Sequence, residues 1–252
     1  MPHTVELRFY EELNDFLPPG RRKQPFRVSF PEARSVKDLI ESQGVPHSEV
    51  DLILVNGEAV GFDHRVRDGD RVSVYPTFES LDIQAAARLG RPPLRECRFV
   101  ADVHLGKLAR RLRLLGFDCL YNRAWDDRAL AECAAAEGRI LLTRDRGLLM
   151  RRSVTHAIFV RGDLADQQVR LVLARLDLAR AARPFSRCLR CNAPLVEVPR
   201  AAVAGRVPAF TWRTAPAFFQ CTGCQAVYWP GTHQPRLEKL VAAALAPSAP
   251  EP

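Results

Sequence analysis

The chain has 252 residues, 47% of them hydrophobic and 26% charged, which is typical of a soluble globular protein of two or three domains. It lacks a run of roughly 20 apolar residues, so a membrane-spanning helix is not expected. The start, MPHTVELRFYEEL, lacks the basic and then apolar layout of a signal peptide, and we therefore expect a cytoplasmic protein.

Charge divides the chain into an acidic first part and a basic remainder. Residues 1–80 carry 14 acidic against 10 basic side chains, whereas residues 81–183 carry 12 against 20 and residues 184–252 carry 3 against 7. A basic part of this kind is the natural place for a polyanion such as a nucleic acid. Arginine-rich helices also serve simply to solvate a face, and charge alone does not separate the two interpretations.

The first 80 residues show a pattern of strands around one helix. Ser35 can cap the helix SVKDLIESQG (35–44), and Gly44 can end it. Gly57 supplies the positive φ that an Asn-Gly hairpin turn requires. The expected strands are VELRFYEEL (5–13), RVSF (27–30), the two arms of DLILVNGEAV (51–60) and DGDRVSVYP (68–76). The order ββαβββ predicts a β-grasp domain over residues 1–80.

This domain resembles the ubiquitin-like sulfur carriers of molybdopterin and thiamine biosynthesis, particularly in VNGEAV followed by DGDRVSVYP. Those carriers act through a free Gly-Gly tail, whereas here the last strand runs into PTFESLDIQ and the chain continues. We therefore expect no carrier chemistry, and instead a structural role or docking to a protein partner.

The next segment, residues 81–97, has the Pro-, Gly- and Arg-containing composition of a linker. After it, strands and helices alternate through residues 98–183, which predicts a parallel sheet with helices on its faces. The expected strands are RFVA (98–101), FDCLY (117–121), RILLT (139–143) and HAIFV (156–160), and the expected helices are 105–116, 126–138 and 164–178.

Aspartates of this α/β domain stand where a ligand crevice is expected, beyond the carboxyl ends of the strands. Asp102 and Asp145 each follow a strand, and Asp127 begins a helix, with Asp126 beside it. Carboxylates that crowd together repel one another unless a cation neutralises them, and hard oxygen ligands select Mg²⁺ or Mn²⁺. With basic residues around them, such carboxylates are typical of a metal-dependent nuclease. The alternative is that each aspartate only caps a helix or ends a strand.

The cysteine pattern is the strongest local signal. Two Cys-x₂-Cys pairs bracket a segment that contains RVPAFTW, and this spacing predicts a closed, structural Cys₄ zinc ribbon formed by Cys188, Cys191, Cys221 and Cys224. His233 is a spare candidate ligand, but four cysteines already saturate zinc. We expect the aromatic side chains of the ribbon to pack its small core, with base stacking as a minor alternative: Phe210, Trp212, Tyr228 and Trp229. The other cysteines are expected to be ordinary buried thiols: Cys97, Cys119 and Cys133.

Taken in order, FVADVHLGKLARRLRLLGFD, DDRALAECAAAEGRILLTRD, RCLRCN and YWPGTH resemble one family over roughly residues 97–240. It is the group related to the C-terminal domain of the Mut-seven exonuclease, a PIN-like ribonuclease domain with an attached zinc ribbon, in which an N-terminal ubiquitin-like domain is a known arrangement. The resemblance implies that three aspartates are the acidic catalytic positions and metal ligands: Asp102, Asp127 and Asp145. It leaves Asp126 open, as well as a fourth carboxylate, for which Asp163 is a candidate.

Basic side chains near these aspartates are candidate phosphate contacts: Lys107, Arg111 and Arg144. For each of them, a solvated basic face is the alternative. His104 lies two residues after Asp102, and a loop histidine without a catalytic role is the simpler interpretation.

The sequence thus predicts an α/β protein of three folded modules with a linker and a tail: a β-grasp domain (1–80), the linker (81–97), a PIN-like ribonuclease domain (98–183), a zinc ribbon (184–240) and a flexible tail (241–252). Its expected activity is Mg²⁺- or Mn²⁺-dependent hydrolysis of RNA phosphodiester bonds, with RNA as partner and no membrane. The alternative is a non-catalytic RNA-binding or adaptor protein that docks to other proteins through its β-grasp domain.

Overall fold

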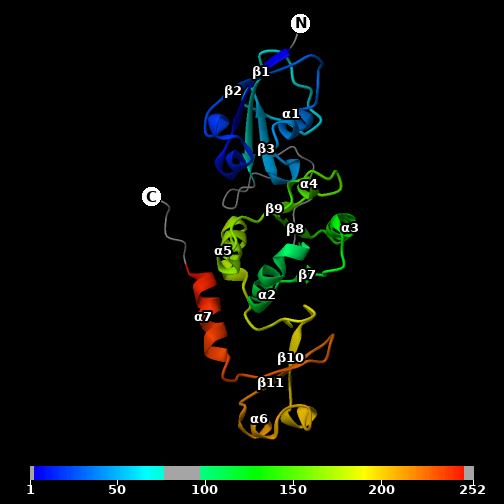
Figure 1. Ribbon diagram of the computed structural model, residues 1–252, viewed down its shortest axis with the longest axis vertical. Helices are drawn as coiled ribbons and strands as arrows, with labels where there is room; N and C mark the ends of the chain where they lie inside the picture. Colours follow the sequence, from blue (N-terminus) through cyan, green and yellow to red (C-terminus); the bar gives the residue numbers. More distant parts are fainter. Residues whose placement is uncertain (1–2, 77–96, 247–252) are drawn as a thin grey trace. The chain divides into compact units, whose positions relative to one another are not determined.

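The computed structural model (Figure 1) describes residues 3–76 and 97–246. The expected linker, residues 81–97, therefore lies outside the described residues apart from Cys97. Among the helices in the two described ranges, none has the length and apolar character needed to cross a bilayer.

The chain folds into two compact units. The first contains the N-terminal domain together with residues 127–159, and the second contains residues 97–126 and the chain from residue 160 onward. The ribonuclease domain expected over residues 98–183 is therefore divided between the two units, and each unit is described by itself below.

The N-terminal domain is a mixed five-stranded sheet with the order β2-β1-β5-β3-β4. Its strands are β1 (His3–Phe9), β2 (Phe26–Phe30), β3 (Val50–Val55), β4 (Glu58–Ala59) and β5 (Arg71–Pro76). Strands β1 and β5 run parallel, the other neighbours are antiparallel, and helix α1 (Val36–Ser42) covers one face of the sheet (Figure 1). The predicted β-grasp fold is confirmed.

Local signals explain the turns of this domain. Ser35 caps α1, because its hydroxyl accepts a hydrogen bond from the backbone N–H of Asp38 at 3.1 Å. Gly44 follows the helix with a φ of +86°. Asn56 and Gly57 both have positive φ, +53° and +89°, as the tight turn between two antiparallel strands requires.

One expected strand is shorter than predicted. The strand expected over residues 5–13 ends at Phe9, and Glu11–Phe16 form the 3-10 helix η1. The alternation of buried and exposed side chains stops there, because Leu13 and Phe16 are both buried and stand three residues apart, a helical spacing.

The N-terminal domain is tied to residues 127–159 of the same unit by the 3-10 helix η3 (His47–Glu49), whose three side chains are polar and buried. Buried polar groups need hydrogen-bond partners, and these come from residues more than 100 positions away. His47 Nε2 lies 3.1 Å from the carbonyl oxygen of Val154, Ser48 Oγ donates to that of Leu149 at 2.9 Å, and the Glu49 carboxylate accepts from the N–H of Phe159. This domain is therefore an integral part of its unit.

The α/β elements follow in the expected order. The strands are β6 (Phe99–Ala101), β7 (Cys119–Tyr121), β8 (Ile140–Thr143) and β9 (Ala157–Phe159), and the helices are α2 (Gly106–Leu114), α3 (Asp127–Glu137), α4 (Arg146–Leu149) and α5 (Ala165–Arg175). Strand β6 pairs with β7 and strand β8 pairs with β9, both in parallel, so the predicted parallel α/β class is confirmed. Helix α4 is unexpected, because four residues are too few to show a periodic pattern.

The basic helix α2 buries the apolar face that its sequence predicts: Leu105, Leu108, Ala109, Leu112 and Leu115. Gly116 ends the helix with a φ of +91°. A Cβ atom at this position would lie 2.1 Å from the carbonyl oxygen of Arg183, so no larger residue fits.

The ribbon, residues 184–240, contains a three-stranded antiparallel sheet of β10 (Leu195–Val198), β11 (Phe218–Cys221) and β12 (Val227–Tyr228), with the short helix α6 (Ala209–Thr214) between β10 and β11. Its core consists of Val203, Val207, Ala215 and Phe218. The expectation that the ribbon aromatics pack this core is wrong for Phe210, Trp212 and Trp229, which are exposed, whereas Tyr228 is half-buried. The core is small enough for four short or single-ring side chains to fill it.

Helix α7 (Gln234–Leu245) crosses the boundary expected at residue 240. The tail predicted from residue 241 is therefore helical up to Leu245. Helix α7 packs against α5 of the same unit, and Leu237 and Leu240 on α7 are half-buried. This tertiary contact explains why the helix continues.

Replacing Ser48 with alanine should lower the free energy of unfolding by about 1–2 kcal/mol, because the buried carbonyl of Leu149 loses its donor. Ser42→Ala is the matched control. Its exposed hydroxyl bonds only to neighbours in or directly after α1, the carbonyl oxygen of Leu39 and the side-chain amide of Gln43, so the change should stay within about 0.5 kcal/mol. Urea unfolding followed by circular dichroism and tryptophan fluorescence measures both. Equal stabilities of the two variants would contradict the expected role of Ser48.

Candidate metal centre and active-site residues

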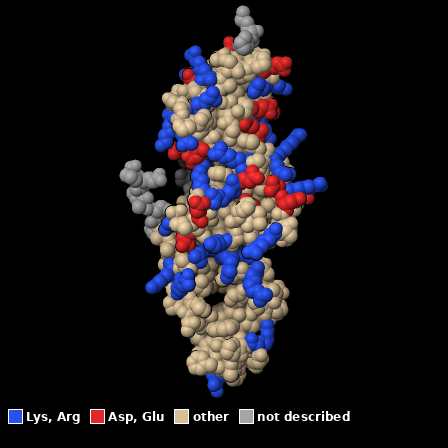
Figure 2. Space-filling model, in the orientation of Figure 1, with Lys and Arg blue, Asp and Glu red and all other residues tan. Residues whose placement is uncertain are grey.

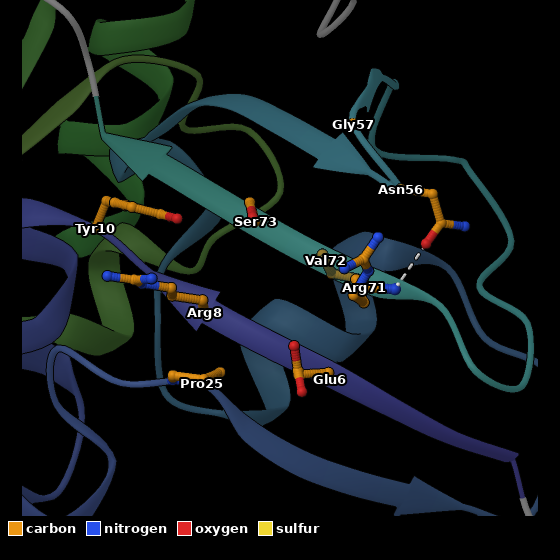
Figure 3. Close-up of a pocket in the computed structure, with 9 residues that line it drawn as sticks. All are labelled: Glu6, Arg8, Tyr10, Pro25, Asn56, Gly57, Arg71, Val72 and Ser73. Atoms are coloured by element: carbon orange, nitrogen blue, oxygen red, sulfur yellow. Dashed lines mark hydrogen bonds between the residues drawn. The ribbon is translucent and has the colours of Figure 1, made fainter.

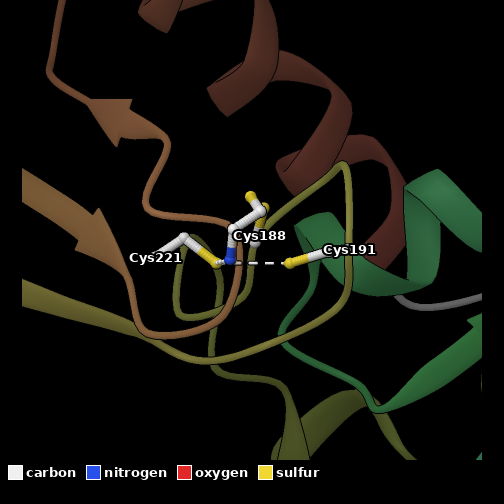
Figure 4. Close-up of side chains that lie close together, drawn as sticks. Cys188, Cys191 and Cys221 are labelled. Atoms are coloured by element: carbon white, nitrogen blue, oxygen red, sulfur yellow. Dashed lines mark hydrogen bonds between the residues drawn. The ribbon is translucent and has the colours of Figure 1, made fainter.

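Two tight turns bring the four ribbon cysteines together (Figure 4). All four sulfur atoms lie within 4.8 Å of one another; the Sγ atoms of Cys188 and Cys224 are 3.6 Å apart, and those of Cys191 and Cys221 are 3.3 Å apart. A tetrahedral ion with metal–sulfur bonds of about 2.3 Å separates its sulfur ligands by about 3.8 Å. The four thiols therefore fit one tetrahedral metal ion.

Hydrogen bonds set the protonation of this group before any metal binds. Burial acts to raise the pKa of the Cys188 thiol, but hydrogen bonds from the Tyr228 hydroxyl and from the backbone at Cys191 and Arg190 lower this pKa to about 6. Burial raises the pKa of Cys221 to about 12, and hydrogen bonding to the neighbouring thiols adds to the rise. The Cys188 thiol therefore loses its proton more readily than a free thiol, and metal binding must displace protons from the thiols that retain them.

The first cysteine turn is fixed to strand β7 by Asn192, a buried residue with a φ of +74°. Its side-chain amide donates to Asp118 Oδ1 at 2.7 Å, and its Oδ1 accepts from the N–H of Cys119 at 3.0 Å. Arg113 of α2, also buried, donates to the carbonyl oxygens of Cys119, Leu189 and Arg190. The sequence patterns predict a role for neither Asn192 nor Arg113. The one local signal is that the polar residue Asn192 directly follows the first cysteine pair.

The cysteines outside the ribbon carry no comparable arrangement. Cys119 is fully buried, whereas Cys97 and Cys133 are half-buried. Burial raises the pKa of the Cys97 and Cys133 thiols, so these groups stay protonated at neutral pH.

The candidate catalytic aspartates stand at the element ends where the sequence puts them. Asp102 follows β6, is 4% exposed, and accepts a hydrogen bond from the N–H of His104 at 2.7 Å through Oδ1. Asp145 follows β8 and caps α4, accepting from the N–H groups of Gly147 at 2.7 Å and Leu148 at 3.4 Å, again through Oδ1. Asp145 and Asp102 are therefore caps, as the alternative interpretation expects. A cap formed through one carboxylate oxygen is compatible with metal binding through the other.

Asp127 is the first residue of α3, and its Oδ2 lies 3.9 Å from Nη2 of Arg151. The neighbouring Asp126 and the more distant Asp163 are exposed. Across the described residues, the ribbon cysteines are the one group of three or more potential ligands that the structure brings within reach of a single ion. A cation shared by the aspartates therefore stays a prediction from the sequence.

The candidate phosphate contacts differ in their surroundings. Lys107 on α2 is exposed, and so is Arg144, which directly follows β8. Arg111 is partly exposed and forms an ion pair with Asp166 of α5, with Nε and Oδ1 3.0 Å apart. The side chain of His104 is exposed. Its backbone N–H donates the hydrogen bond that forms the cap at Asp102.

Helix α4, which Asp145 caps, is held at both ends by the N-terminal domain. Arg146, its first residue, donates to the carbonyl oxygen of Asp15 at 3.4 Å and lies over the rings of Phe16 and Phe159. Leu149, its last residue, accepts the hydrogen bond from Ser48. The N-terminal domain thus fixes the turn that presents Asp145, a relation that no local sequence pattern indicates.

The N-terminal domain also has a small pocket of about 300 Å³ over β1 and β5 (Figure 3). Glu6, Arg8, Tyr10 and Arg71 line it, and Asn56 Oδ1 accepts from the N–H of Arg71 at 2.9 Å at one end. Its lining carries both signs of charge, with Arg8 and Arg71 beside Glu6.

A ubiquitin-like fold is thus followed by an α/β segment with aspartates at its strand ends and by a group of four cysteines that fits one metal ion. Residues 97–241 match the family described as "Mut7-C RNAse domain", which covers more than half of the chain, and residues 2–82 match the family described as "Mut7-C ubiquitin". The chain belongs to the Mut7-C RNase domain family. The resemblance stated from the sequence motifs is confirmed.

Among characterised proteins, the chain is similar to "Exonuclease mut-7 homolog" from Homo sapiens, with 39% identity over 106 residues. The match covers 40% of this chain and 12% of the human protein, so the chain spans only a small part of that relative's length.

Two solved structures resemble the N-terminal domain. "Putative molybdopterin converting factor, subunit 1" from Pyrococcus furiosus is 23% identical, with a TM-score of 0.25, over 30% of this chain and 99% of that one. SAMP1 from Haloferax volcanii is 19% identical, with a TM-score of 0.24, over 31% of this chain and 99% of that one.

Cys191→Ser should release the ribbon metal and unfold the ribbon, because folding of such a site depends on the bound ion. Elemental analysis should find about one metal ion per wild-type chain and little in the variant. The matched control is Cys133→Ser, which removes a half-buried thiol outside the group and should keep the full metal content. Well-folded wild-type protein without stoichiometric metal would contradict this.

Proposed function

We propose that this protein is a Mg²⁺- or Mn²⁺-dependent ribonuclease that hydrolyses RNA phosphodiester bonds. The observation that carries the proposal is the match of residues 97–241 to the Mut7-C RNase domain, within which Asp102, Asp127 and Asp145 all lie. The similarity to a protein named as an exonuclease supports the same reaction class.

In this proposal the three aspartates hold the catalytic cation. Carboxylate oxygens are the ligands that Mg²⁺ and Mn²⁺ prefer. Backbone N–H groups fix the carboxylates of Asp102 and Asp145 directly after their strands, so little side-chain freedom is lost when they bind an ion. When bound, such an ion neutralises phosphate charge and activates water for attack on the phosphodiester.

We assign Lys107, Arg111 and Arg144 to the RNA phosphates. The exposed positions of Lys107 and Arg144 support this assignment. The ion pair of Arg111 with Asp166 does not oppose it, because Asp166 is more than half exposed and such surface pairs contribute little. A phosphate can therefore compete with Asp166 for the guanidinium group.

We further infer that the ion of the ribbon is zinc and that it is structural. Thiolates are soft ligands that select zinc in a tetrahedral site. Cys188, Cys191, Cys221 and Cys224 supply all four positions, which leaves no open position for a reacting water.

The second candidate is a non-catalytic RNA-binding or adaptor protein. The capping bonds of Asp102 and Asp145 favour it, because they give both aspartates a structural use without catalysis. The mixed-charge pocket of the N-terminal domain (Figure 3) supplies a surface for protein docking. Metal-dependent cleavage of RNA by the purified chain separates this candidate from the enzyme.

Asp145→Asn should lose nearly all cleavage while keeping its stability. Asparagine caps a helix as well as aspartate does, so without added metal the free energy of unfolding should change by less than about 0.5 kcal/mol. Mn²⁺ should stabilise the wild type more than the variant, because the variant holds the ion weakly. RNA cleavage assays and thermal unfolding with and without Mn²⁺ measure these effects.

Asp145→Ala is the comparison that isolates the cap. It removes both hydrogen bonds to α4 and should cost about 1 kcal/mol without Mn²⁺, and more with Mn²⁺, because only the wild type gains the full stabilisation by the ion. If Asp145→Asn cleaves RNA at the wild-type rate, Asp145 is a cap alone and is not a metal ligand.

A further inference from the structure

The ribbon carries a groove that the proposed reaction does not use. It lies between α6 and the first turn of α7, with residues 227–233 along it, and its volume is about 520 Å³. Its lining is rich in rings and apolar side chains, among them Phe210, Tyr228, Trp229, Pro230, His233 and Leu237.

Two of the aromatic side chains in this groove are open to solvent. Phe210 is 71% exposed and Trp229 is 36% exposed. Neither belongs to the ribbon core, so their apolar surface faces water in the isolated chain. A groove with two exposed rings offers flat surfaces on which another planar group can stack.

The motif YWPGTH holds one of these rings in place. Trp229 and His233 both come from it, and Gly231 lies between them. A Cβ atom at residue 231 would stand 3.2 Å from Nε1 of Trp229 and 3.4 Å from its Cδ1. Glycine therefore lets the indole edge approach the backbone, which keeps the ring beside the groove.

The charge around the groove is mainly basic, and the acidic side chain at its edge, Glu238, accepts a hydrogen bond from the lining residue Gln234 at 3.0 Å. Between Glu197 and Glu238 the chain contains four arginines and no Asp or Glu, and every residue that lines the groove belongs to this stretch. Arg213 on α6 and Arg236 on α7 are exposed beside the lining residues. On the face drawn in Figure 2, the lower end of the molecule, which is the ribbon, shows basic side chains and no acidic ones.

We propose that this groove binds the unstacked bases of single-stranded RNA. Every base has a face that stacks on an aromatic ring, and arginines beside the rings can hold the phosphates. The inference rests on RNA being the substrate, as proposed above, and adds that the enzyme takes single strands and binds them through ribbon residues as well as through the aspartates. A duplex keeps its bases stacked inside and cannot use the groove.

Fluorescence anisotropy of labelled RNA tests this with the full, metal-loaded chain and no added Mg²⁺ or Mn²⁺, so that cleavage does not interfere. The probes are a single strand of about 12 uridines and the same strand annealed to its complement. The wild type should bind the single strand at least about tenfold more tightly than the duplex.

Trp229→Ala and Phe210→Ala should each weaken binding of the single strand by about 5- to 100-fold, because each removes one stacking surface. Trp229→Phe keeps a ring and should retain most of the affinity. Trp212→Ala is the matched control: Trp212 is as exposed as Trp229, at 36%, but does not line the groove, and its loss should leave RNA binding unchanged. Metal content is measured for every variant to verify that the ribbon is folded.

Wild-type affinity in both Trp229→Ala and Phe210→Ala overturns the proposal, as does equal binding of single strand and duplex or no binding at all. If Trp229→Ala loses its metal, the test rests on the RNA affinities of the other two variants. Weakened binding by Phe210→Ala with retained binding by Trp229→Phe then supports the proposal, and unchanged binding by Phe210→Ala overturns it. If the wild type cleaves RNA and the alanine variants bind RNA as well as the wild type does, the proposed ribonuclease activity holds and the proposed groove is wrong. If the alanine variants lose binding but the wild type does not cleave RNA in Mg²⁺ or Mn²⁺, the groove proposal holds and the proposed ribonuclease activity is wrong.

Discussion

Buried polar groups need hydrogen-bond partners, and at two junctions of this chain the partners come from a neighbouring module of the same unit. In the first unit, Ser48 of the N-terminal domain bonds to the end of α4. In the second, Asn192 beside the first cysteine pair bonds to the N–H of Cys119 in β7, and Arg113 spans the same junction. Removing either module would leave buried donors or acceptors without partners, which costs more than losing an apolar contact of the same size. Within each unit, the modules are therefore joined by buried hydrogen bonds.

This interlocking bears directly on the candidate active site. Asp145 is presented by a helix of four residues, which is too short to be stable alone and depends on its cap and on tertiary contacts. Arg146 and Leu149 supply those contacts, one to the backbone at Asp15 and the other to Ser48. A change in the N-terminal domain can thus move a candidate catalytic carboxylate without touching the ribonuclease segment.

The sequence predicts the parts of this structure that depend on local chemistry. Ser35 as a helix cap, the Asn-Gly hairpin turn and the two Cys-x₂-Cys turns each involve atoms only a few residues apart. It fails where distant contacts decide. Helix α7 continues because it packs on α5, and the exposure of Phe210 and Trp229 follows from a core that four other residues fill. The aspartates fall between these cases: their positions at element ends are local, whereas a shared ion depends on tertiary placement.

The resemblance of the N-terminal domain to sulfur carriers is a likeness of fold. In this chain part of the domain's surface is buried against residues 149–159. Strand β5 ends at Pro76 within a chain that continues, so no free carboxylate follows it. The side chains of η3, which a free-standing domain would have to solvate, are buried against residues 149–159. In this chain the side chains of η3 bond to Leu149, Val154 and Phe159, and the mixed-charge pocket over β1 and β5 is lined by other residues of the domain.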